Sequence, residues 1–247
     1  MTIREPEIVD LSTPRGAMRT IIFRPTGEGR YPGLVLWSEI FQVTAPIRRT
    51  AAFLAGHGFI VAVPEVYHEF LSAGTVLAYD QAGADRGNEL KYAKELASYD
   101  DDSRAVVDWL RSHAQGNGRV GAMGICLGGH LAFRTAMLPG VAATACFYAT
   151  DIHQGSLGKG KADNSLARLS EISGELLMIW GRQDPHVPAE GRANIYAALA
   201  AAGTHFTWHE FNAAHAFLRD EGPRFDPALA HLTLGMTVDF FRSKLAL

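Results

Sequence analysis

Three side chains of this 247-residue sequence could together carry out acyl transfer: the thiol of Cys126, the carboxylate of Asp184 and the imidazole of His215. A thiolate attacks carbonyl carbon, an imidazole moves protons, and a carboxylate orients the imidazole. Cys126 is the centre of a Gly-Ile-Cys-Leu-Gly segment at positions 124–128, between an apolar run and a stretch of helical spacing. This pattern is typical of a nucleophile on a tight strand-to-helix turn, where Cβ atoms two residues to either side would collide. The N-terminal N–H groups of the following helix would favour the thiolate.

Each of these residues could instead have a purely structural role. Cys126 could be a buried structural thiol, Asp184 the cap of a helix, and His215 a hydrogen-bonded loop residue. The separations are 58 and 31 residues (184 − 126 and 215 − 184), close to one or two strand–helix units. The order nucleophile, acid, histidine is that of the triad in α/β-hydrolase folds. We therefore favour a joint role as nucleophile, orienter and base.

Strands and helices alternate along the chain in a way that would bring these residues together. Besides the run before Cys126, strands are predicted at residues 8–11, 18–23, 33–37, 59–63, 142–148, 176–180 and 206–211, the first two as an antiparallel hairpin. Helices are predicted at residues 47–56, 89–112, 189–202 and 227–245. We predict a single α/β domain over residues 1–247, with a doubly wound, mostly parallel sheet and helices on both faces. Ligands of such sheets bind at the carboxyl ends of the strands, where the three residues fall.

Two stretches carry weaker patterns. Residues 65–88 are long, glycine-containing and irregular, which predicts a lid or binding segment. The Asp-Asp-Asp-Ser run at 100–103 predicts a break within residues 89–112 and a new helix cap. It resembles a cation site only in its charge, so we interpret it as a solvated cap.

The composition argues against several classes of protein, namely nucleic-acid-binding, membrane-spanning, secreted and metal-binding ones. A net charge of −3 offers no basic surface for nucleic acid or anionic lipid. No apolar stretch approaches the roughly 18 residues of a membrane span, and residues 1–6 lack the character of a secretory signal. Both cysteines, Cys126 and Cys146, lie in or beside apolar runs, so we expect a reducing, cytoplasmic location. The ten histidines show no metal-binding spacing, so we expect no metal and no other cofactor.

Along nearly its whole length the sequence resembles the dienelactone hydrolases (carboxymethylenebutenolidases) of the α/β-hydrolase fold. The segments that carry this resemblance are Trp-Ser-Glu-Ile-Phe (37–41), Pro-Glu-Val-Tyr (64–67), Gly-Ile-Cys-Leu-Gly-Gly (124–129), Gln-Asp-Pro-His-Val-Pro (183–188) and His-Ala-Phe-Leu-Arg (215–219). The resemblance implies Cys126 as nucleophile, His215 as base and Asp184 as orienter. It also implies an oxyanion hole made by the backbone N–H groups of Ile40 and Leu127.

Glu39 has a further role that the resemblance implies. In this family the resting thiol is neutral and turned toward such a glutamate. A substrate carboxylate pairs with an arginine and frees the glutamate to take the thiol proton. Arg219 matches the carboxylate-binding arginine, and Arg86 is the candidate for a second one. Phe41 and Tyr148 are candidates for the apolar lining of the pocket.

Two positions depart from the family pattern. Ile125 stands where tyrosine is common, which alters the pocket floor, and Glu65 replaces the usual aspartate of the Pro-x-x-Tyr turn. We predict a cysteine-dependent hydrolase that opens a carboxylate-bearing enol-lactone through an acyl-enzyme. The alternatives are a broad carboxylesterase or thioesterase with the same triad and a non-catalytic binding protein of this fold. The expected partner is a small-molecule substrate, with no nucleic acid or membrane, and the chain is expected to be a monomer or weak homodimer.

Overall fold

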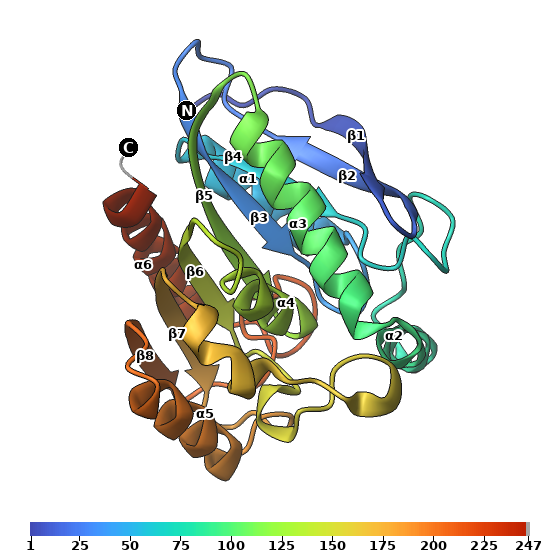
Figure 1. Cartoon of the computed structure of the whole chain (residues 1–247), viewed down its shortest axis with the longest axis vertical. Helices are drawn as coiled ribbons and strands as arrows, with labels where there is room; N and C mark the ends of the chain where they lie inside the picture. The colour runs from blue at the N-terminus through green and yellow to red at the C-terminus, as the bar shows by residue number, and fades with distance from the viewer. Residues whose placement is uncertain (246–247) are drawn as a thin grey trace.

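One eight-stranded sheet organises the chain, and the computed structural model describes residues 1–245 (Figure 1). The strand order is β1-β2-β4-β3-β5-β6-β7-β8. The strands are β1 (Glu7–Thr13), β2 (Gly16–Phe23), β3 (Tyr31–Trp37), β4 (Ile60–Pro64), β5 (Gly116–Ile125), β6 (Val141–Phe147), β7 (Glu175–Gly181) and β8 (Phe206–Phe211). β1 and β2 pair antiparallel, β2 pairs antiparallel with β4, and the remaining pairs are parallel. The predicted hairpin and mostly parallel sheet are confirmed.

Helices cover both faces of this sheet. They are α1 (Ala45–Gly56), α2 (Gln81–Ala93), α3 (Leu96–Ser112), α4 (Leu127–Thr135), α5 (Ala189–Ala201) and α6 (Pro227–Leu245), with short 3₁₀ helices η1 (Ile152–Gln154), η2 (Lys159–Lys161) and η3 (Ser165–Glu171). α1 and α6 pack on one face, and α3, α4 and α5 pack on the other (Figure 1). Val35 contributes to one core layer, while Leu34 and Leu36 contribute to the opposite one. The apolar run of β3 is therefore continuous because its side chains alternate between two buried faces.

The parallel strands end at a common edge of the sheet. The ends of β3 and β5 are aligned, with Trp37 opposite Gly124, and the last residues of β5 and β6 are paired as Ile125 and Phe147. The loops that leave this edge, together with α2, form the site described below. No helix within residues 1–245 combines the length and apolar character needed to cross a bilayer.

Two predictions for the segment between β4 and β5 are wrong. The helix expected to begin at residue 89 already begins at Gln81, where the carboxylate of Asp80 caps its first turn. The helix break lies between α2 and α3 and not at the acidic run, which falls inside α3. Local charge suggested a cap at residues 100–103 because acidic side chains favour helix N-termini, but tertiary partners hold these side chains within the helix.

Asp102 shows why the solvated-cap interpretation fails. Its side chain is 1% exposed, and its carboxylate contacts His68 Nε2 at 3.0 Å and Lys94 Nζ at 3.0 Å. Lys94 is itself fully buried and also pairs with Glu69. These charges are tolerated inside the protein because each has an opposite charge beside it.

Candidate active site

The turn that carries the thiol lies between β5 and α4. Cys126 adopts φ 61° and ψ −120°, a conformation that costs a non-glycine residue backbone strain. A Cβ added at Gly124 would lie 1.7 Å from the backbone oxygen of Gly128, and one at Gly128 would lie 2.2 Å from that of Trp37. Both positions therefore require glycine, as the sequence predicts. The Cys126 N–H donates to the Phe147 carbonyl at 3.0 Å, which anchors the turn to the neighbouring strand end.

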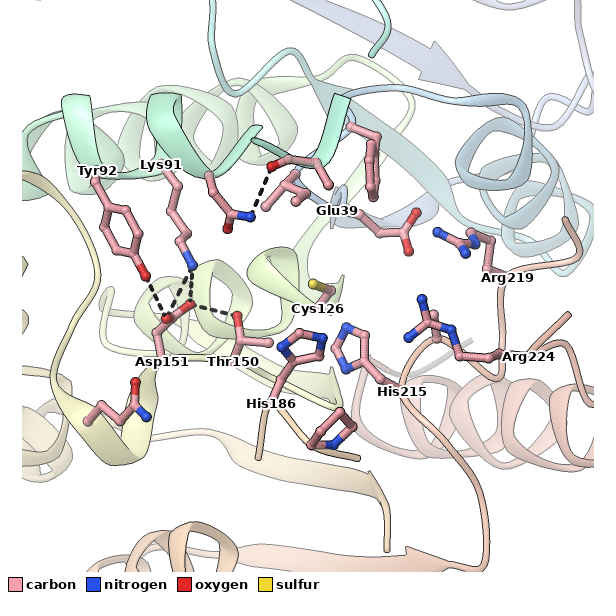
Figure 2. A pocket seen from close by; sticks show the side chains of 17 residues that line it. Glu39, Lys91, Tyr92, Cys126, Thr150, Asp151, His186, His215, Arg219 and Arg224 are labelled. Atoms are coloured by element: carbon pink, nitrogen blue, oxygen red, sulfur yellow. Dashed lines mark hydrogen bonds and ion pairs between the residues drawn. The ribbon is translucent and has the colours of Figure 1, made fainter. Parts of the chain in front are cut away.

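The imidazole and its carboxylate form a buried pair. The His215 Nδ1–H donates to Asp184 Oδ2 at 2.7 Å, and the backbone N–H of His186 donates to Asp184 Oδ1 at 2.8 Å. Burial acts to raise the pKa of Asp184, but the hydrogen bond and charge of His215 outweigh it and lower that pKa. Burial acts to lower the pKa of His215, but Cys126 and Asp184 outweigh it and raise that pKa to about 10. The imidazole thus lies between the Asp184 carboxylate and the Cys126 thiol, and Figure 2 shows His215 next to Cys126.

Glu39 is buried next to this group. Its carboxylate accepts a hydrogen bond from the Tyr79 hydroxyl at 2.8 Å, and that hydroxyl also lies 2.7 Å from Thr44 Oγ1. The Arg219 guanidinium stacks on the Tyr79 ring at 4.1 Å from its centroid. Burial raises the pKa of Glu39, while Arg219 and Tyr79 act in the opposite direction. Glu39 is therefore a carboxylate of increased basicity held beside a cation (Figure 2).

A cavity of about 410 Å³ surrounds these side chains. Cys126 lies near its middle, with Arg219 and Arg224 at one end and Lys91 and Asp151 at the other (Figure 2). Within residues 1–245, no three His, Cys, Asp or Glu side chains are arranged to hold a metal ion. The arrangement can attack a carbonyl carbon, transfer a proton and hold an anion.

Comparison with known proteins assigns the family. The model of the dienelactone hydrolase family matches residues 18–245. The chain belongs to this family. A provisionally named carboxymethylenebutenolidase of Saccharomyces cerevisiae is 42% identical over 96% of this chain and 90% of its own length. The carboxymethylenebutenolidase of Rhodococcus opacus is 32% identical over 87% of this chain and 82% of its own length. Membership of the dienelactone hydrolase family indicates a hydrolase that acts on ester or lactone bonds.

Solved structures share the fold at low sequence identity. A Klebsiella pneumoniae protein described provisionally as a dienelactone hydrolase has a TM-score of 0.84 at 19% identity and covers 98% of this chain and 99% of its own. A dienelactone hydrolase-like promiscuous phosphotriesterase from metagenomic libraries has a TM-score of 0.79 at 17% identity and covers 99% of both chains. At these identities the likeness shows the α/β fold alone.

Most of the site residues predicted from the sequence line the cavity of this dienelactone hydrolase family member. Its lining includes Cys126, His215, Glu39, Ile40, Phe41 and Arg219. Asp184 lies behind His215. Leu127 is the first residue of α4, so its N–H has no partner within the helix. Ile125 is 3% exposed and does not line this cavity; it borders a small second pocket shared with Glu39 and Arg219.

Arg86 and Tyr148 lie elsewhere. The Arg86 guanidinium pairs with Glu89 at 2.7 Å, and its side chain is 42% exposed, so the structure does not bring it to the cavity. Arg224 lines the cavity near Arg219 instead. Tyr148 is fully buried and packs edge-to-face on His215, with ring centroids 4.9 Å apart, so it supports the imidazole from behind.

Helix α2 contributes residues that the sequence reasoning missed. Ala84, Asn88 and Lys91 line the cavity at spacings of four and three residues, which is one face of a helix. That spacing is visible in the sequence, but assigning residues 65–88 to an irregular segment concealed it. α2 is also fixed to the loop after β3, because a Cβ at Gly87 would lie 2.6 Å from the backbone oxygen of Ile40.

Proposed function

We propose that this chain hydrolyses a carboxylate-bearing enol-lactone through a thioester on Cys126. One observation carries the proposal: a thiol on a strained turn lies in a cavity together with the His215–Asp184 pair and the Arg219 guanidinium. The thiol supplies the nucleophile, the pair supplies the proton transfers, and the guanidinium selects an anionic substrate.

The reaction has two halves. In the first, the Cys126 thiolate forms a C–S bond with the lactone carbonyl, and the oxyanion lies near the N–H groups of Ile40 and Leu127. The ring C–O bond then breaks, and the enolate oxygen leaves with a proton from the His215 imidazolium. In the second half, His215 removes a proton from water, the resulting hydroxide attacks the thioester, and the C–S bond breaks to regenerate the thiolate.

In the proposed mechanism, Glu39 and Arg219 restrict formation of the Cys126 thiolate to the substrate-bound state. Arg219 acts to lower the pKa of Glu39. A substrate carboxylate that pairs with Arg219 would weaken this effect and add a second negative charge near Glu39. Glu39 then becomes a stronger proton acceptor for the Cys126 thiol.

Hydrolysis of the dienelactone tests the nucleophile. We expect Cys126→Ala to reduce kcat/KM by about 10⁴-fold or more, as loss of a covalent nucleophile does. Cys146→Ala is the matched control, because it removes the other thiol, which is fully buried in β6. Unchanged hydrolysis by Cys126→Ala would contradict the mechanism.

Alkylation by iodoacetamide tests the role of Glu39. Succinate should accelerate labelling of Cys126 at pH 7, the neutral analogue succinamide should not, and Arg219→Met should abolish the acceleration. Fast labelling that succinate leaves unchanged would point to a permanent thiolate.

The volume of the cavity keeps a broad carboxylesterase as a second candidate, because about 410 Å³ exceeds the space that a small lactone fills. Neutral aryl esters distinguish the two functions. For the proposed function, Arg219→Met should reduce kcat/KM for the anionic lactone about 10–100-fold, the range expected for a lost charged hydrogen bond. Equal losses for anionic and neutral esters would favour the carboxylesterase.

A further inference from the structure

The cavity extends well beyond Cys126 on the side away from the arginines. Its far wall is formed by Lys91 and Tyr92 of α2 and by Asp151, which follows β6 (Figure 2). None of these three residues takes part in the mechanism proposed above. They form a polar end of the cavity that lies opposite Arg219, with the nucleophile between the two.

A buried ion pair builds this end. Lys91 Nζ lies 3.0 Å from Asp151 Oδ2 and 3.2 Å from Oδ1, and the two side chains are only 7% and 8% exposed. Asp151 also accepts hydrogen bonds from the hydroxyls of Thr150 at 2.7 Å, Ser156 at 3.2 Å and Tyr92 at 3.4 Å. Two carboxylate oxygens offer about four acceptor positions, so Asp151 has none left for a ligand.

Lys91 keeps one donor. An ammonium has three N–H groups, and the described hydrogen bonds of Lys91 within residues 1–245 account for two of them, both to Asp151. The nearby Tyr92 hydroxyl helps Asp151 to raise the pKa of Lys91, but it is not among the described hydrogen-bond partners of Nζ. The Tyr92 ring lies 4.4 Å from Nζ and leaves the ammonium at the cavity wall. Asp151 cancels the charge of Lys91, and Lys161, whose Nζ lies 4.7 Å from the Tyr92 ring centroid, does not line the cavity, so this end favours a neutral acceptor oxygen over a second carboxylate.

Stability alone does not account for this arrangement. A buried ion pair is often no more stable than apolar side chains of the same volume, and Asp151 adopts a left-handed conformation with φ 68°, which costs a non-glycine residue strain. Strained backbone and buried charge together at a cavity wall are typical of a binding site.

We propose that the Lys91 end binds a neutral acceptor oxygen, such as a carbonyl or ether, on the acyl side of the substrate. This inference rests on the proposed function, in which Arg219 holds a carboxylate on the leaving-group side. The substrate class is thus an ester or enol-lactone with a carboxylate on one side of the scissile bond and a neutral oxygen-bearing acyl chain on the other.

A series of 4-acyloxybenzoates tests the assignment, because the carboxylate is constant and the acyl chain varies. One ether oxygen replaces a methylene at position 4, 5 or 6 of a heptanoyl chain, and a chain with a terminal carboxylate serves as the anionic member. We expect one ether position to exceed the plain chain in kcat/KM by about 10-fold, as a hydrogen bond to a charged donor can supply. In Lys91→Met/Asp151→Asn the ratio should fall to about one.

Lys159→Met is the matched control, since Lys159 is a surface lysine paired with Glu95 and outside the cavity. It should keep the wild-type ratio. The wild-type series also stands alone if the double variant does not fold. Equal rates at every ether position, or a preference for the anionic chain, would overturn the assignment. Failure of the wild type to hydrolyse any member would instead count against the proposed function.

Discussion

With succinate bound, the state in which the proposed mechanism forms the thiolate, replacing Cys126 with alanine should lower the pKa of His215. Burial alone acts to lower this pKa, and the charge and hydrogen bond of Cys126 together with those of Asp184 raise it to about 10, against an ordinary value of 6.5. A single opposite charge a few ångströms away changes a pKa by about 1–3. In the variant the contribution of Cys126 is lost, while Asp184 and Glu39 still oppose burial, so we expect the pKa of His215 to fall by about 1–3.

Nuclear magnetic resonance of the ring protons of His215 provides the assay, with resonances assigned by comparison with His215→Gln. Titrations of wild type and Cys126→Ala should differ at this one residue. Cys146→Ala should titrate as wild type does, because its thiol is buried elsewhere in β6. Repeating both titrations without succinate should remove most of the difference between wild type and Cys126→Ala, because the proposed mechanism leaves the resting thiol neutral.

An unchanged pKa in Cys126→Ala with succinate bound would refute the reasoning. It would mean that Asp184 alone holds the imidazolium and that the thiol carries no charge in the state titrated.

Three further predictions concern stability in urea. Gly128→Ala should lower the free energy of unfolding by more than about 4 kcal/mol or prevent folding, because its Cβ would overlap backbone atoms. Gly235→Ala is the control: its Cβ would lie in open space on α6, so it should raise the free energy of unfolding by about 0.5–1 kcal/mol. Lys94→Met should cost about 3–5 kcal/mol, since two carboxylates lose their buried partner; a loss below about 1 kcal/mol would exclude that role. Burial acts to raise the pKa of Asp163, but His130 and other neighbours outweigh it and lower that pKa to about 2. The lowered pKa contributes about 2 kcal/mol to the free energy of unfolding above pH 4, and this contribution is lost as the pH falls through 2. The loss of stability in Asp163→Asn should therefore vanish toward pH 2.

The sequence predicted those parts of the fold and site that local rules specify. Glycines at 124 and 128 identify a strained turn because no other residue fits, and apolar runs identify buried strands. Asp184 and His215 could be placed because parallel strands end at one edge of the sheet.

Other features depend on contacts between distant residues and could not be predicted in this way. Asp102 looks like a solvated cap until Lys94 and His68 are found beside it. Lys91 and Asp151 are 60 residues apart, and neither position alone indicates a pair. Arg86 has the right residue type, but its place on α2 turns it away from the cavity.

The close packing of Gly87 on Ile40 links the proposed Lys91 binding end to the proposed oxyanion hole. Helix α2 carries Lys91, and its backbone at Gly87 leaves no room for even a methyl group against the Ile40 carbonyl. The Tyr67 hydroxyl donates to the Gly87 carbonyl at 3.0 Å and limits sliding of the helix. A displacement of α2 toward the loop after β3 therefore moves Ile40, the residue whose N–H is proposed to stabilise the oxyanion. Occupancy of the far end of the cavity should accordingly appear in the turnover number and not only in substrate affinity.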